Sequence, residues 1–111
     1  MKKIDKQNYI LLQVEEQQVL GEFIKAVSQH IMNEPDENYV IDLLGFADID
    51  KEHIKQMVSI HESIHPENYS LVVLIDQLKV EELPEEINTV PTLKEAEDVI
   101  QMEMIERDLG F

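Results

Sequence analysis

The sequence predicts a single α/β domain over residues 1–111, with a mostly parallel central sheet of about four to five strands and helices packed on it. Two observations favour this class. Short apolar runs of strand length alternate with longer segments in which apolar residues recur every three to four positions. Several of the short runs are apolar almost throughout, which is typical of strands buried on both faces of a parallel sheet.

The first third of the chain contains a strand hairpin and a helix in this interpretation. Residues 9–14 form an apolar strand, preceded by a hairpin strand around Ile4. From residue 17 to residue 32 the spacing becomes that of one face of an amphipathic helix. The Asn-Glu-Pro-Asp-Glu segment at 33–37 ends this helix, because proline cannot continue a helix and Asn and Asp favour turns.

The middle of the chain contains two buried strands on either side of a second helix. Residues 39–44 and 69–75 are the apolar strands, and the helix between them spans residues 51–64. Asp50 is its expected N-cap, since a short carboxylate there accepts the free N–H groups of the first turn. Right-handed crossovers place the loops that follow both strands at the same edge of the sheet.

The last third of the chain is expected to hold an acidic loop, a short strand and a long helix. Residues 76–87 form the loop, with one helical turn around residues 80–83, and residues 87–90 form the strand. Thr92 caps the helix, with Glu95 placed for a capping box. The apolar face of this helix is Leu93, Ala96, Val99, Ile100 and Met104. The apolar residues in excess of one buried stripe suit either an adaptable contact surface or packing on the first helix: Met102, Met104, Ile105, Leu109 and Phe111.

The charge and composition of the chain exclude several classes of partner and site. Nine basic residues against 24 acidic ones give a net charge of −15, which repels phosphate groups, so we expect no nucleic-acid and no membrane partner. Cysteine is absent, which excludes disulfides, thiolate metal sites and cysteine nucleophiles. The sequence has no apolar run of membrane length and no signal-peptide core, so we expect a cytoplasmic protein.

The motifs for catalysis and metal binding are weak. His61 and His65 match the His-Glu-x-x-His pattern of zinc proteases, but Pro66 follows at the end of the helix and no third ligand is evident. No serine lies in a Gly-x-Ser-x-Gly elbow, and no glycine-rich loop is present to hold phosphates. We therefore expect no enzyme activity, no cofactor and no metal, and we expect both histidines to be structural.

Residues 40–50, Val-Ile-Asp-Leu-Leu-Gly-Phe-Ala-Asp-Ile-Asp, resemble the central signature of STAS domains, which bacterial anti-sigma-factor antagonists typify. In that family a strand ending Asp-Leu-Ser-Gly leads through an apolar loop to Asp-Ser-Ser-Gly at a helix start. Four positions match this pattern: Asp42, Gly45, Ile49 and Asp50. The resemblance implies a STAS-like fold and a non-enzymatic domain for protein–protein interaction and regulation.

The chain departs from the STAS pattern where the family is regulated. The two serines after the loop aspartate, one of which is phosphorylated in the antagonists, correspond here to Lys51 and Glu52. A kinase has no hydroxyl to modify there, although Glu52 supplies a fixed negative charge that is weaker than a phosphate. The resemblance implies a protein partner, and a homodimer is also compatible with the sequence. The expected contact residues are Phe46, unless it belongs to the core, with Asp48, Asp50, Lys51 and Glu52.

Two other functions stay open. Residues 90–100 and 105–111 are similar to a group of small Bacteroidetes proteins often labelled "ribonuclease Z", which implies an RNA-processing, metal-dependent hydrolase. The chain lacks the His-x-His-x-Asp-His motif through which that enzyme binds two zinc ions, and its charge suits tRNA badly. The other alternative is a module that binds a small ligand or lipid, which a sizeable pocket between helices and sheet would favour.

Overall fold

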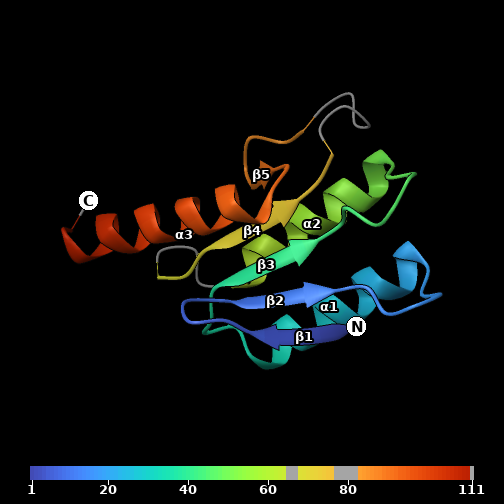
Figure 1. The fold of residues 1–111 in the computed structure, drawn as a ribbon, viewed down its shortest axis with the longest axis horizontal. Coiled ribbons are helices and arrows are strands. Elements are labelled where there is room, and N and C mark those ends of the chain that lie inside the picture. The colour runs from blue at the N-terminus through green and yellow to red at the C-terminus, as the bar shows by residue number, and fades with distance from the viewer. Residues whose placement is uncertain (65–67, 77–82, 111) are drawn as a thin grey trace.

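The computed structural model describes residues 1–64, 68–76 and 83–110. Their fold is α/β, with a five-stranded sheet that has helices on both faces (Figure 1), which confirms the predicted class. The strands are β1 (Lys2–Asp5), β2 (Ile10–Gln13), β3 (Tyr39–Asp42), β4 (Leu71–Leu74) and β5 (Asn88–Val90). The helices are α1 (Leu20–Asn33), α2 (Lys51–Ser63) and α3 (Leu93–Asp108).

The sheet is mixed, with its strands in the order β1-β2-β3-β4-β5. β1 pairs antiparallel with β2, whereas the other three pairs of neighbours are parallel. The expectation of a mostly parallel sheet is therefore wrong. The physical reason lies in the first connection, where the backbone N–H of Lys6 donates to the carbonyl of Tyr9 at 2.9 Å. So short a turn can join two neighbouring strands only if they are antiparallel, because a parallel pair needs a long crossover connection.

The two faces of the sheet are covered by different helices. Helices α1 and α2 pack on one face and α3 packs on the other (Figure 1). Successive strand residues point to opposite faces, so Val40 contacts the α3 side while Ile41 contacts the side of α1 and α2. Because both faces are buried, β3 and β4 read as continuous apolar runs. The prediction that they are central, buried and parallel neighbours is confirmed.

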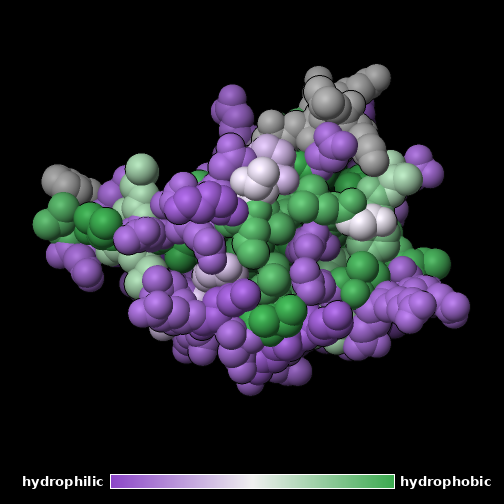
Figure 2. Space-filling view, in the orientation of Figure 1, coloured by the Kyte–Doolittle hydropathy of each residue, from purple (hydrophilic) through white to green (hydrophobic). Residues whose placement is uncertain are grey.

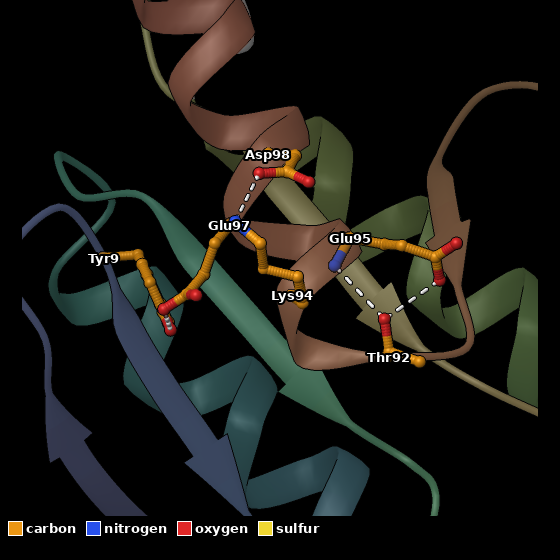
Figure 3. A network of polar contacts seen from close by, with 6 residues as sticks. All are labelled: Tyr9, Thr92, Lys94, Glu95, Glu97 and Asp98. Atoms are coloured by element: carbon orange, nitrogen blue, oxygen red, sulfur yellow. Dashed lines mark hydrogen bonds and ion pairs between the residues drawn. The ribbon is translucent and has the colours of Figure 1, made fainter.

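The starts of α2 and α3 follow their capping residues. Oδ1 of Asp50 accepts the backbone N–H of His53 at 3.0 Å, which confirms the predicted N-cap. Oγ1 of Thr92 accepts the backbone N–H of Glu95 at 3.2 Å, and the same hydroxyl donates to Oε2 of Glu95 at 3.0 Å (Figure 3). The Glu95 side chain therefore closes this cap through the threonine hydroxyl, and not through the backbone N–H of a capping box.

One local prediction is wrong, and another concerns residues outside the described part of the chain. Helix α1 begins at Leu20, later than expected, because Gln17 adopts a left-handed backbone conformation with φ of 66° in the preceding turn. A right-handed helix cannot include such a residue. The helical turn expected around residues 80–83 falls largely in residues 77–82, which lie outside the described part of the chain.

Candidate functional site

The carboxyl ends of β3 and β4 meet at one edge of the sheet, because these strands run in parallel. The backbone N–H of Leu43 donates to the carbonyl of Leu74 at 2.9 Å and extends this pairing past β3. The loop of residues 43–50 then leads into the first turn of α2. We call residues 43–52 the carboxyl edge, since α/β proteins commonly place functional groups at this position.

Asp42 shapes the beginning of the carboxyl edge. Its Oδ1 accepts the backbone N–H of Leu44 at 2.9 Å, and its Oδ2 accepts a hydrogen bond from Nε2 of Gln13 at 3.2 Å. The first bond turns the chain out of the sheet after β3, in the manner of an aspartate that bonds the backbone two residues on. The second ties the same carboxylate to β2. Asp42 is therefore a structural residue of the edge.

Phe46 anchors the loop. Its ring is half-buried and lies 5.7 Å, between ring centroids, from the ring of Phe23 in α1. It also packs against the hydrophobic core that α1 and α2 form with the sheet. The sequence leaves open whether Phe46 contacts a partner or belongs to the core. Its packing against Phe23 and the core assigns it to the core. The large apolar side chain that this loop exposes is Leu44, which is 41% exposed. The exposure of Leu44 is not visible in the sequence, because an apolar run at the end of a strand does not show which of its residues reaches solvent.

Asp50 ends the loop and starts α2. Besides capping the helix, its Oδ1 lies 2.9 Å from Nδ1 of His53. A carboxylate at this position is also favoured by the positive end of the helix dipole. Both contacts hold Asp50 against α2, so its first role is to orient the helix.

Besides Asp50, which is exposed while it caps α2, three of the predicted contact residues reach solvent: Asp48, Lys51 and Glu52. Oε1 of Glu52 lies 3.6 Å from Nζ of Lys55, and both side chains are about three-quarters exposed. Such a pair contributes little to stability. These charges are therefore available to a partner without loss to the fold.

Lys51 also borders a depression that sequence analysis missed. Its volume is about 340 Å³, and its lining residues are Lys51, Ile54, Lys55, Leu83 and Pro84. Two of the nine basic residues of the chain therefore flank an apolar floor. The four-residue spacing of the two lysines on a helix is visible in the sequence. The approach of Leu83 and Pro84 is not, because they come from a segment about thirty residues further on.

His61 and His65 do not meet in the described part of the structure, since His65 lies outside it. His61 is half-buried on α2, and its Nδ1 has no hydrogen-bond partner among the residues described. Within residues 1–64, 68–76 and 83–110, no three His, Asp or Glu side chains lie close enough to hold a metal ion together. The absence of a metal and of a cofactor stays a prediction.

A groove of about 590 Å³ runs between α1 and α2 and is larger than the depression beside Lys51. Its lining comes from these two helices, including Gly21, Ser28, Ser59 and Ser63. The groove is on the outer side of the helix layer, while the space between that layer and the sheet is filled by fully buried side chains such as Phe23 and Ile41. Its position therefore differs from the internal pocket that would favour the ligand-binding alternative.

Comparison with known proteins identifies no family and no relative of this chain. No protein family model and no curated protein sequence matches the chain. Among the helices of the described residues, none is long and apolar enough to span a membrane.

Proposed function

We propose that this chain is a cytoplasmic, non-enzymatic, STAS-like domain that binds a protein partner at its carboxyl edge. The observation that carries the proposal is the exposure of Leu44 just after β3, on a carboxyl edge that also exposes the charged residues Asp48, Lys51 and Glu52. Protein–protein contact sites combine exposed apolar side chains with polar and charged ones. Figure 2 shows hydrophobic side chains at the surface around the carboxyl ends of the parallel strands.

The roles of two signature residues support the STAS-like part of the proposal. Asp42 and Asp50 match the STAS pattern in the sequence and stand at the two ends of the loop. Asp42 turns the chain out of β3, and Asp50 starts α2. Residues at these positions therefore shape the loop that, in the family resembled, leads to the regulatory helix. The order of a strand hairpin followed by alternating helices and strands is also compatible with the resemblance.

The side chains at the start of α2 favour a permanent contact over a phosphorylation switch. Lys51 and Glu52 occupy the positions of the two family serines, and both are exposed. The charge of Glu52 is always present and is accompanied by Lys55 at 3.6 Å. A partner therefore meets the same surface at all times, with the apolar floor of the Lys51–Lys55 depression beside it.

The test is affinity capture with matched variants. Wild-type protein, Leu44→Ser and Lys51→Glu are immobilised and incubated with an extract of the native cells, and the bound proteins are quantified by mass spectrometry. The controls are Val19→Ser and Lys25→Glu, which make the same changes at exposed positions of the α1 region. Circular dichroism confirms that every variant is folded.

The proposal expects one partner that wild type and both controls retain and that both carboxyl-edge variants lose. Equal recovery by all five proteins would place the contact elsewhere. Turnover of an RNA or small-molecule substrate by wild-type protein, abolished by a single side-chain substitution, would contradict the non-enzymatic assignment.

A further inference from the structure

The C-terminal half of α3 carries an exposed apolar stripe. Met102, Ile105 and Leu109 are 61%, 52% and 65% exposed. Their spacing of three and four positions places them on one side of the helix. Ala96 and Ile100, which are buried against the sheet, lie on the opposite side. The stripe is therefore not an extension of the core.

The stripe is held out from the body of the domain. The C-terminal turns of α3 project past the strands (Figure 1), and hydrophobic side chains are visible at that end of the molecule in Figure 2. On the inner side of the same turns, Nη1 of Arg107 donates to Oγ of Ser70 at 3.1 Å. This bond fixes the inner face towards the sheet. The outer face is consequently presented to solvent in a defined orientation.

The charges around the stripe determine which partner it suits. Asp98 lies one turn before Met102, Glu106 lies one turn after it, and all three are exposed. Asp108 adds a further exposed carboxylate beside Ile105 in the next turn. Lys94 lies towards the other end of the helix and offsets Asp98, with which it pairs at 3.1 Å. Arg107 bonds Ser70 on the inner side, so Glu106 and Asp108 are the carboxylates that the rim offers to a partner.

A second copy of this chain fits the stripe poorly. It would bring identical carboxylates together between two molecules that each carry a net charge of −15. A partner helix with apolar residues at matching spacing can cover the stripe, and Lys or Arg residues beside them can pair with the carboxylates around it. The methionine adds an adaptable apolar contact.

We propose that the stripe of Met102, Ile105 and Leu109 docks a basic amphipathic helix of a protein partner. Its apolar residues cover the stripe, and its cations face Glu106 and Asp108. This contact is separate from the carboxyl edge, which involves other elements. Failure of one proposal therefore leaves the other standing.

The probe is a synthetic peptide of about 18 residues, with leucines at helical spacing and lysines elsewhere, long enough for three anchor turns. A twin peptide with glutamate in place of lysine tests the charge. Binding to the full chain is measured by isothermal titration calorimetry at physiological ionic strength. The double variant Ile105→Ser/Leu109→Ser removes the stripe without changing the net charge. The matched control Val19→Ser/Met32→Ser removes two other exposed apolar side chains.

We expect wild type and the control to bind the lysine peptide with equal affinity. Loss of two apolar anchors should weaken binding of the stripe variant by about tenfold or more, and the glutamate peptide should not bind. Equal binding by the stripe variant would mean attraction to net charge alone and would overturn the proposal, as would no binding by wild type. Sedimentation that shows a wild-type dimer, lost in Ile105→Ser/Leu109→Ser, would also overturn it in favour of a second copy.

Discussion

The hydroxyl of Tyr9 donates a hydrogen bond of 2.7 Å to Oε2 of Glu97, across 88 positions of the sequence (Figure 3). The bond joins the residue that precedes β2 to the first half of α3. The tyrosine is 6% exposed and belongs to the core on the α3 side of the sheet. Burial, followed by the bond to Glu97 and its charge, raises the pKa of the Tyr9 phenol well above its ordinary value. Tyr9 thus ties the start of β2 to α3 by both packing and a hydrogen bond.

Tyr9→Phe should lower the free energy of unfolding by about 1 kcal/mol, because a hydrogen bond to a partly exposed carboxylate is lost while the ring stays packed. Glu97→Gln is the matched change on the other side, and it should cost less because the amide oxygen still accepts. Urea denaturation followed by circular dichroism measures both. A Tyr9→Phe protein as stable as wild type would show that this bond contributes nothing.

The titration of Tyr39 should be shifted to high pH. Burial, with the nearby charges of Glu34 and Glu37, raises the pKa of this phenol from 10.0 to about 12. The neutral form is favoured by folding, so the resulting stability is complete below pH 10.0 and is lost as the pH rises through about 12. Tyrosinate absorbance should therefore rise at higher pH in wild type than in urea-denatured protein. The component near pH 12 should disappear in Tyr39→Phe, while the raised pKa of Tyr9 should remain. Superimposed folded and denatured titrations would refute this.

Val73→Asp should abolish folding. Val73 is fully buried in β4, between Ile41 of β3 and Thr89 of β5 in the sheet. An unpaired carboxylate there should cost more than about 4 kcal/mol. Val19→Asp places the same side chain at the exposed N-cap of α1 and should be tolerated. Thermal melts of the two variants test the assignment, and a cooperative transition for Val73→Asp would disprove it.

Asp50→Ala and Asp48→Ala should separate structure from contact. Asp50 caps α2, so its loss should lower the free energy of unfolding by about 1 kcal/mol. Asp48 is exposed two positions earlier, and its loss should leave stability within about 0.5 kcal/mol of wild type. In the capture experiment, Asp48→Ala should reduce recovery of the partner although it is fully folded. Equal stability of the two variants would contradict the capping role.

Deletion of residues 105–111 should leave a folded domain. The buried residues of α3, Ala96 and Ile100, are retained, and the main loss is the bond from Arg107 to Ser70. We expect a fall of about 5 °C in Tm, equivalent to about 1 kcal/mol. The truncated protein should also fail to bind the lysine peptide. Loss of the cooperative melt would instead assign these residues to the core.

Local signals predicted the elements of this fold well. Each strand in the middle of the chain is an apolar run closed by a polar or glycine residue, and each helix shows a period of three to four. Asp50 and Thr92 predict the starts of their helices. A capping bond joins residues three positions apart, so a local sequence pattern is enough to identify it. The start of α1 was misplaced, since the positive φ of Gln17 is not marked by a glycine.

The sequence predicts the position of the carboxyl edge but not which of its side chains are exposed. Parallel pairing brought the loop after β3 to the expected edge. Phe46 is half-buried because its ring packs on Phe23 of α1, while Leu44 is exposed to solvent. No local sequence pattern indicates this contact, because Phe23 lies in a different element. The depression beside Lys51 likewise depends on Leu83 and Pro84, which are distant in the sequence.

The sequence by itself determined the α/β class, the central position of β3 and β4, and the capping of two helices, because apolar periodicity and capping act over a few residues. The tertiary structure decided the mixed sheet, the bond between Tyr9 and Glu97, and the exposure of Leu44 and of the stripe on α3. These features depend on which segments pack together. An apolar residue in a helix is buried or exposed according to whether another element covers it, and that is a property of the whole chain.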